Sequence, residues 1–208
     1  MYSRVQYISQ GRTPEEQLRN IQAVLDAGYN WIQLRFKHQE EHALLPVAAQ
    51  VKRLCESYQA TFIMNDHVQI AKAVDAHGVH LGLTDTSVSE ARRMLGNEKI
   101  IGGTANTLAH VVQRMDEGCN YIGLGPFRFT TTKEKLSPIL GPEGYQNIME
   151  ALSEQERTTP VYAIGGIEHA DFEGLRDIGI FGIAVSSLLT NVTPIPQGLF
   201  QQPSTIPS

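Results

Sequence analysis

The sequence predicts an α/β protein of the closed (β/α)8 class, a TIM barrel with an atypical, proline-rich C-terminal end. Eight short apolar segments alternate along the chain with longer segments whose apolar residues recur every three or four positions. Strands that are apolar along almost their whole length and alternate with helices are typical of a parallel sheet covered by helices. An open doubly wound sheet would show the same pattern, but eight regular units favour the barrel.

The predicted strands are short runs rich in β-branched and other apolar residues, each followed by polar or glycine-containing sequence. They occupy residues 5–9, 31–36, 61–66, 78–81, 99–104, 121–126, 160–166 and 182–187.

Helices are predicted between these strands. In the first, Thr13 is placed to cap the helix, Pro14 fits its first turn, and Gly28 fits its end. One face of this helix carries the apolar residues Leu18, Ile21, Val24 and Leu25. The predicted helices occupy residues 13–28, 41–58, 67–76, 87–95, 107–117, 142–156 and 169–178.

Residues 1–190 are therefore expected to form one barrel domain, and residues 191–208 are expected to differ from it. Four prolines fall in this tail: Pro194, Pro196, Pro203 and Pro207. Because proline removes a helical hydrogen bond and clashes with the preceding turn, the eighth helix is predicted to be very short or absent. The alternative to a very short last helix is a tail that is irregular and in part disordered.

Composition limits the class of protein. The chain of 208 residues is 41% hydrophobic and 19% charged, which suffices for a large core without disulfides or a structural metal. Its formal net charge of −5 argues against a nucleic-acid partner. No apolar run is long enough for a membrane span or a signal peptide. We therefore expect a cytoplasmic protein in which Cys55 and Cys119 are buried thiols.

Long polar side chains follow the second predicted strand. Alternation places Gln33, Arg35 and Lys37 on one side, where they would be costly to bury without a partner. An anion at the mouth of the barrel would supply that partner, because the C-terminal ends of the strands form the active site in this fold. The alternative is that Arg35 and Lys37 are solvated residues at the rim.

Two carboxylates follow neighbouring strands. Asn65 and Asp66 end the third strand, and Asp85 follows the fourth, which favours a site for a hard metal such as Mg²⁺. Taken singly and from the pattern alone, each aspartate is better explained as the cap of the next helix. We interpret His80 as a hydrogen-bonded core residue.

The other half of the predicted mouth offers hydroxyls and glycines. Thr130, Thr132 and Lys133 lie on the loop after the sixth strand and could donate to phosphate oxygens, although a flexible polar loop fits as well. The loops after the seventh and eighth strands contain Gly165 and Gly166, and then Ser186 and Ser187. In many barrels these two loops bind phosphate through backbone amides.

Together these elements resemble the thiamine-phosphate synthase family. The motifs that carry the resemblance are QLRFK at 33–37, ND at 65–66, GVHLGLTD at 78–85, IIGGT at 100–104, YIGLGPFRFTTTK at 121–133, AIGGI at 163–167 and the strand ending in Ser187. The resemblance runs in order through about residues 5–190. It implies a (β/α)8 barrel that joins hydroxymethylpyrimidine diphosphate to hydroxyethylthiazole phosphate with Mg²⁺, giving thiamine phosphate and pyrophosphate. It further implies a dissociative reaction, in which pyrophosphate leaves before the thiazole nitrogen attacks.

The resemblance also implies roles for individual residues. Asp66 and Asp85 would hold Mg²⁺. The diphosphate would be bound by Arg35, Lys37, Asn65 and Lys133. Of these, Arg35, Lys37 and Lys133 are the implied catalytic residues. Those implied to lie by the pyrimidine and the diphosphate are Gln33 and Thr104. Those implied to bind the thiazole phosphate are Thr130, Thr132, Gly165, Gly166, Ser186 and Ser187.

Departures from the family pattern are few. Thr104 stands where the family usually has Ser, Ser186 replaces a usual apolar residue, and the tail lacks the usual final amphipathic helix. The expected partners are the two small-molecule substrates, with no nucleic acid and no membrane. The sequence does not decide between a monomer and a homo-oligomer.

Rival interpretations are less well supported. A thiazole tautomerase would need a His where this chain has Asn106. A non-catalytic barrel that binds a phosphorylated ligand would not require the aspartate pair. A sugar-phosphate isomerase would need a general base, and no Glu lies at a strand end.

Overall fold

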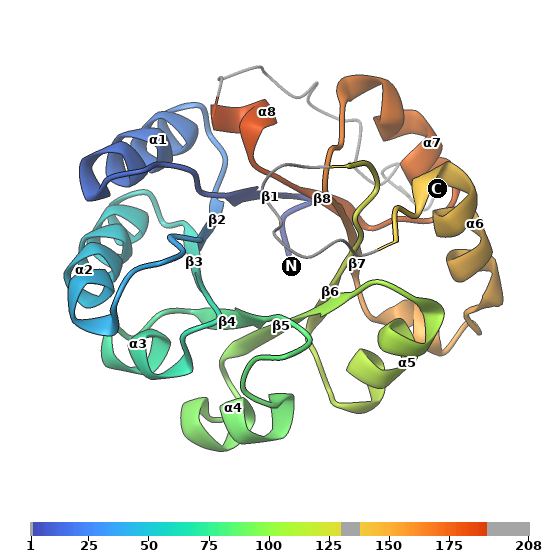
Figure 1. Cartoon of the computed structure of the whole chain (residues 1–208), viewed down its shortest axis with the longest axis horizontal. Helices are drawn as coiled ribbons and strands as arrows, with labels where there is room; N and C mark the ends of the chain where they lie inside the picture. Colours follow the sequence, from blue (N-terminus) through green and yellow to red (C-terminus); the bar gives the residue numbers. More distant parts are fainter. Residues whose placement is uncertain (1, 130–137, 191–208) are drawn as a thin grey trace, which may run out of the picture.

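A closed barrel of eight parallel strands forms the centre of the molecule (Figure 1). The computed structural model describes residues 2–129 and 138–190. Each strand pairs with its neighbours in sequence, and β8 closes the barrel against β1. The strands are β1 (Val5–Ile8), β2 (Trp31–Leu34), β3 (Thr61–Asn65), β4 (Gly78–Leu81), β5 (Ile100–Ala105), β6 (Tyr121–Leu124), β7 (Val161–Ile164) and β8 (Gly182–Val185). The predicted TIM barrel is confirmed.

Helices surround the barrel (Figure 1). They are α1 (Pro14–Asp26), α2 (Glu41–Ser57), α3 (Val68–Ala73), α4 (Val88–Leu95), α5 (Leu108–Asp116), α6 (Gly141–Ala151), α7 (Phe172–Asp177) and α8 (Ser187–Thr190), with 3-10 turns η1 (Glu156–Thr158) and η2 (His169–Asp171). Within the described part of the chain α8 has only four residues. The predicted irregular tail at 191–208 lies outside the described residues.

Two of the predicted helices are shorter in the structure, and each is accompanied by a 3-10 turn. The segment 142–156 ends as a helix at Ala151 because Leu152 is extended and buried, and a separate 3-10 turn follows. The segment 169–178 begins as a 3-10 turn and becomes α-helical only at Phe172.

The start of α1 agrees with its predicted capping. The Thr13 hydroxyl accepts a hydrogen bond of 3.2 Å from the Glu16 N–H, and Pro14 is the first helical residue. The buried face differs slightly from the prediction, because Gln17 is buried while Leu18 is only partly so. The Gln17 amide nitrogen donates to the Gly11 carbonyl at 3.0 Å, whereas its buried Oε1 has no hydrogen-bond partner among the described residues.

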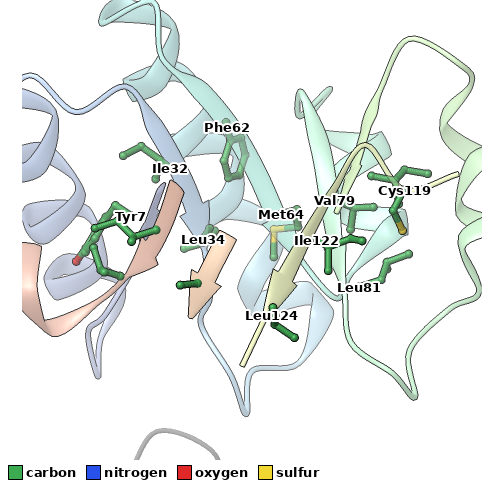
Figure 2. Close-up of a cluster of buried hydrophobic side chains, with 14 of the residues drawn as sticks. Tyr7, Ile32, Leu34, Phe62, Met64, Val79, Leu81, Cys119, Ile122 and Leu124 are labelled. Carbon is green, nitrogen blue, oxygen red and sulfur yellow. The ribbon is translucent and has the colours of Figure 1, made fainter. Parts of the chain in front are cut away.

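Strand alternation divides the core into an outer and an inner part. The side chains that face the helices form the main apolar layer, part of which Figure 2 shows: Tyr7, Ile32, Leu34, Phe62, Met64, Val79, Leu81, Cys119, Ile122 and Leu124. A second cluster includes Trp31, Ile63, Tyr121 and Tyr162, one of which comes from each of four strands. Since every second residue of a strand faces the same way, Gln33 points to the same side as Trp31, and Asn65 to the same side as Ile63. The barrel interior is therefore apolar at the starts of β2 and β3 and polar at their ends, where Gln33 and Asn65 lie.

Two further expectations concern the cysteines and membrane-spanning helices. Cys55 and Cys119 are free and buried, as predicted. Among the residues that the structure describes, no helix has both the length and the apolar character that a membrane span requires.

Candidate active site

A layer of buried amides lies at the ends of β2 and β3. Gln33 and Asn65 are 2% and 7% exposed, and the Gln33 amide donates to the Asn65 side-chain carbonyl at 2.8 Å. This bond fixes both side chains, because burial would otherwise leave polar atoms without partners. The chain then turns sharply: Asp66 has φ of +63°, a left-handed conformation that is uncommon outside glycine. Its N–H donates to the His80 carbonyl at 2.9 Å, which anchors the turn on β4.

The two predicted metal ligands meet at this turn. Burial and the neighbouring, hydrogen-bonded Asp85 carboxyl raise the pKa of Asp66 to about 7. Two cations oppose this rise, and one of them is the Lys37 ammonium, whose Nζ lies 3.7 Å from Asp66 Oδ2. The other is Arg35. Two carboxylates in contact repel each other once both are ionised, so the arrangement suits a bound hard cation.

The donor set fits Mg²⁺. No cluster of three or more His, Cys, Asp or Glu side chains that could hold a metal occurs within residues 2–129 and 138–190. The protein therefore offers two carboxylates at this point rather than a complete cage. Mg²⁺ is usually bound in this way, through one or two carboxylates together with substrate phosphates and water.

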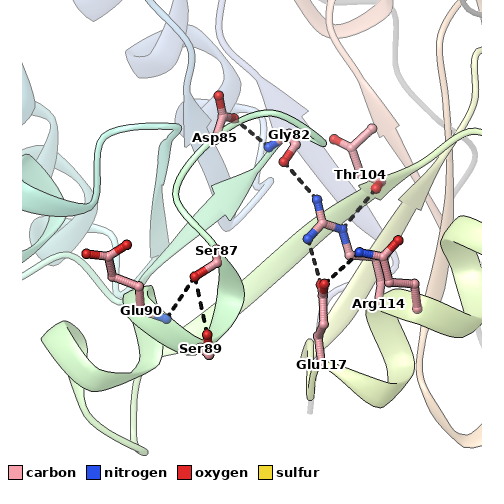
Figure 3. A network of polar contacts seen from close by, with 9 residues as sticks. Gly82, Asp85, Ser87, Ser89, Glu90, Thr104, Arg114 and Glu117 are labelled. Atoms are coloured by element: carbon pink, nitrogen blue, oxygen red, sulfur yellow. Dashed lines mark hydrogen bonds and ion pairs between the residues drawn. The ribbon is translucent and has the colours of Figure 1, made fainter.

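Neither aspartate caps a helix, so the alternative interpretation of each is wrong. The cap position of α3 is His67, which makes no side-chain capping bond. The cap of α4 is Ser87, whose hydroxyl accepts from the Glu90 N–H at 3.2 Å. The Asp85 carboxylate instead accepts from the Gly82 N–H at 2.6 Å, within its own loop (Figure 3). Both carboxylates therefore lie at the C-terminal ends of their strands without capping the helices that follow.

A chain of hydrogen bonds leads from the barrel interior to Thr104. The Gln6 amide donates to the Tyr121 hydroxyl at 3.1 Å. The same Tyr121 hydroxyl lies 3.0 Å from His80 Nδ1. The other ring nitrogen of His80 lies 3.0 Å from the Thr104 hydroxyl. His80 is 5% exposed, so its predicted role as a hydrogen-bonded core residue is confirmed. The roles of Gln6 and Tyr121 were missed, and no local motif marks them.

The loop after β2 begins on a fixed base. The Arg35 N–H donates to the buried Ser9 hydroxyl at 3.0 Å, which ties the loop to the end of β1. Arg35 is half-buried and Lys37 is exposed. Since β2 ends at Leu34, both cations lie on the loop rather than on the strand, and only Gln33 belongs to the barrel interior. The structure nevertheless places Lys37 Nζ 3.7 Å from Asp66 Oδ2, while Arg35 acts on Asp66 by lowering its pKa electrostatically.

On the opposite side of the mouth, the described residues contribute mainly backbone and one ion pair. Gly165 and Gly166 follow β7 with φ of +91° and +68°. The Arg128 N–H donates to the Gly165 carbonyl at 2.9 Å, and the Arg128 guanidinium donates to the Gly166 carbonyl at 3.0 Å. Asp171 accepts from Arg128 Nη2 at 2.6 Å and thereby holds that guanidinium. The prediction did not include this ion pair.

Other predicted residues of this side are placed as follows. β8 ends at Val185, so Ser186 and Ser187 do not end the strand as predicted; Ser187 is instead the exposed first residue of α8. The Ser186 hydroxyl donates to the Ile8 carbonyl at 2.7 Å, so its proton is already used. Thr130, Thr132 and Lys133 lie outside the described residues.

Asn106 stands where a tautomerase would have its His. It is 5% exposed, and its side-chain amide donates to the Gly125 carbonyl next to the cis Gly125–Pro126 bond. The side chain therefore supports the end of β6, and an amide cannot act as a general acid or base at this position.

Comparisons with known proteins agree with this geometry. A family model described as thiamine monophosphate synthase matches residues 6–189. A thiamine-phosphate synthase of Flavobacterium psychrophilum is 55% identical over 190 residues, which cover 91% of this chain and 92% of that protein. One of Bacteroides fragilis is 43% identical over 185 residues, covering 89% and 91%. The solved structure of a thiamine phosphate pyrophosphorylase from Pyrococcus furiosus matches with a TM-score of 0.78 at 27% identity, covering 95% of this chain and 92% of its own. The chain therefore belongs to the thiamine monophosphate synthase family.

Proposed function

We propose that this transferase of thiamine biosynthesis condenses 4-amino-2-methyl-5-hydroxymethylpyrimidine diphosphate with 4-methyl-5-(2-phosphooxyethyl)thiazole. The products are thiamine phosphate and pyrophosphate. The observation that carries the proposal is the grouping of charges around Asp66: Lys37 Nζ lies 3.7 Å from Asp66 Oδ2, and Asp85 and Arg35 are near enough to raise and to lower the pKa of Asp66. Two carboxylates beside two cations suit a diphosphate that arrives with a divalent metal.

The diphosphate would lie across the ends of β2, β3 and β4. Mg²⁺ held by Asp66 and Asp85 would neutralise negative charge on the departing pyrophosphate. Arg35, Lys37 and Lys133 would donate hydrogen bonds to the phosphate oxygens and gain strength as charge develops on the leaving group. Asn65 would add a donor from its amide, whose oxygen already accepts from Gln33.

The pyrimidine would lie against the polar part of the barrel interior. Gln33 and Thr104 are the groups expected beside it, and both are held by hydrogen bonds to other buried side chains. A dissociative reaction needs a site that neutralises the leaving group and fixes the ring more than it needs a strong base. The buried amides of Gln33 and Asn65 suit that requirement, because they orient a ring without taking a proton from it.

The thiazole phosphate would lie on the other side of the mouth. The backbone at Gly165 and Gly166 can approach phosphate oxygens closely, since neither residue carries a Cβ. Ser187 is exposed and free of the strand, whereas the Ser186 hydroxyl is committed to Ile8. We therefore expect Ser186 to contribute through its backbone. Thr130 and Thr132 would add hydroxyl donors.

A pyrophosphate-release assay tests the proposal. The purified protein should release pyrophosphate only when both substrates and Mg²⁺ are present, so each component is omitted in turn. Conversion of a thiazole isomer without pyrophosphate release would favour the tautomerase alternative. Binding of thiazole phosphate without any turnover would favour a non-catalytic ligand-binding barrel.

A further inference from the structure

A buried arginine lies beside the predicted diphosphate side of the site. Arg114 belongs to α5 and is only 4% exposed. Burial of a guanidinium is costly unless its donors are satisfied and its charge is paired. Nothing in the reaction proposed above uses this residue, so its retention in the core calls for a physical reason.

Two of the three side-chain contacts of Arg114 reach other elements, and the third supplies its counter-charge (Figure 3). Nη2 donates to the Gly82 carbonyl at 2.8 Å, and Nε donates to the Thr104 carbonyl at 3.2 Å. Nη1 donates to a Glu117 carboxylate oxygen at 2.7 Å, which supplies the counter-charge one turn along the chain. The guanidinium therefore joins α5, the end of β5 and the loop after β4.

Space for this side chain comes from a glycine on β5. A Cβ added to Gly103 would lie 2.7 Å from Arg114 Cδ and 3.0 Å from Nε. It would also lie 2.8 Å from Cys119 Sγ, so both side chains would have to move. Gly103 thus allows the guanidinium to pass over β5 and reach the strand ends.

The two carbonyls belong to residues that bear directly on the site. Gly82 accepts from Arg114 with its C=O and donates from its N–H to the Asp85 carboxylate at 2.6 Å. Thr104 accepts from Arg114 with its C=O while its hydroxyl contacts His80. The Arg114 side chain therefore fixes the backbone of the loop that carries Asp85, the proposed metal ligand. It also fixes the backbone of Thr104, whose hydroxyl is expected beside the pyrimidine.

We propose that Arg114 is a positioning residue, which holds the loop after β4 so that Asp85 faces Asp66 in the geometry that binds the Mg²⁺–pyrophosphate unit. The inference rests on the proposed function, because it assigns the purpose of Arg114 to that site. A merely structural role predicts something different: loss of stability with unchanged binding of metal and pyrophosphate.

Calorimetric titration with Mg²⁺ and pyrophosphate separates the two roles. Arg114→Met should weaken the binding of Mg²⁺ in the presence of pyrophosphate by about tenfold, the loss typical of a group that orients a metal ligand. The KM for the thiazole phosphate should stay within about twofold of wild type, because the side-chain contacts of Arg114 lie on α5, the end of β5 and the loop after β4. Arg114→Lys, which keeps the charge but cannot reach both carbonyls, should fall between the two proteins.

The matched control is Arg92→Met. Arg92 likewise donates to backbone carbonyls, those of Gly96 and Lys99, and to the Asn120 side chain, but at the N-terminal ends of β5 and β6. Its loss should lower the melting temperature without changing the titration. Wild-type affinity in folded Arg114→Met, or in Arg114→Lys if the first variant does not fold, would overturn the proposal.

A double-mutant comparison tests whether Arg114 acts through Asp85. In an Asp85→Asn background, Arg114→Lys should cause no further loss of Mg²⁺ binding, since the ligand it positions is already removed. An additive loss would contradict the proposed route. If the wild type released no pyrophosphate from the two substrates, the proposed function would fail instead, so the two failures are distinguishable.

Discussion

The two sides of the barrel mouth are built in different ways. Between β2 and β5 the functional groups are charged or polar side chains, including two aspartates in contact and a cation 3.7 Å from one of them. Between β6 and β8 the part that the structure describes is shaped mainly by backbone, with left-handed glycines at 165 and 166. The first side is suited to a ligand that brings a metal, and the second to an anion bound by N–H groups.

The support beneath each side differs as well. Under the charged side, hydrogen bonds between buried side chains hold Gln33, Asn65 and Thr104 in place. Under the backbone side, the loops after β6 and β7 bond directly to each other, with the Phe127 N–H donating to the Ile164 carbonyl at 2.9 Å. Substitutions should therefore affect the two substrates separately, and the following tests address that separation.

The largest effect is expected from the aspartate pair. Asp66→Ala should lower kcat for pyrophosphate release by about 100-fold or more, because the leaving group loses its metal-dependent charge neutralisation. Steady-state assays at saturating substrates measure this. Asp75→Ala is the matched control: Asp75 pairs with Lys99 and is exposed, and its loss should leave kcat unchanged. Normal turnover of Asp66→Ala would remove this residue from the metal site.

The next largest effect, about tenfold, is expected on the KM for the thiazole phosphate when the side between β6 and β8 is changed. In Gly166→Ala the new Cβ would lie 2.7 Å from Arg128 Cβ at a left-handed residue, so the turn after β7 must shift. The KM for the thiazole phosphate should rise about tenfold while the Mg²⁺ dependence stays unchanged.

Gly179→Ala provides the control for strain alone. Its φ is +86°, but the nearest atom to an added Cβ is Met149 Cε at 3.9 Å. This variant should lose about 1 kcal/mol of stability with no change in KM. A similar KM change in both variants would mean that the effect is general destabilisation rather than damage to a phosphate site.

Sequence patterns were sufficient for the barrel and for the inner position of Gln33, because alternation along a buried strand depends only on local geometry. The same holds for Thr13, whose capping bond lies within its own turn. Asp66 could be identified as a strand-end residue but not as a left-handed one, since that conformation depends on its hydrogen bond to β4.

Contacts between distant elements were beyond the sequence patterns. Arg128 and Asp171 are 43 positions apart and meet only because β6 and β7 are neighbours in the closed barrel. Arg114 had no recognisable motif, and its role depends on the room left by Gly103. The ends of β8 and of the helix after β6 were also misjudged: β8 ends at Val185, before the two serines, and the helix ends at Ala151, where Leu152 becomes extended.

Two buried tyrosines allow a matched comparison of the two sides. The Tyr121 hydroxyl supports Thr104 through His80, whereas the Tyr145 hydroxyl donates to the Leu124 carbonyl and accepts from the Ile164 N–H at the ends of β6 and β7. Replacing either with Phe should cost about 1–3 kcal/mol, because buried partners lose their hydrogen bonds.

Kinetics should distinguish these tyrosine variants. Tyr121→Phe should raise the KM for the pyrimidine diphosphate about threefold, and Tyr145→Phe should raise that for the thiazole phosphate by a similar factor, since each loosens only its own side. Initial-rate measurements with one substrate varied at a time would show this. Equal changes for both substrates in both variants would mean that the sides are mechanically coupled.

The smallest expected effect is on the stability of the metal-free protein. Burial and Asp85 raise the pKa of Asp66 to about 7, above its ordinary value of 3.8, so between these pH values the folded state keeps a proton that the unfolded state has lost. The stabilisation from this group is present at low pH and is lost as the pH rises through about 7. Asp66→Asn, which cannot ionise, should therefore be more stable than wild type at about pH 8, by about 1 kcal/mol or roughly 2–4 °C in Tm.

The advantage of Asp66→Asn should shrink at about pH 5, where the wild-type carboxyl is protonated and the local repulsion is absent. It should reverse at about pH 8 when Mg²⁺ and pyrophosphate are added, because only the wild type gains their binding energy. Thermal denaturation at the two pH values, with and without these ligands, measures all four cases. A wild type that is more stable than Asp66→Asn at high pH without ligand would mean that Lys37 and Arg35 already compensate the aspartate pair, and the charged side would then be preorganised without metal.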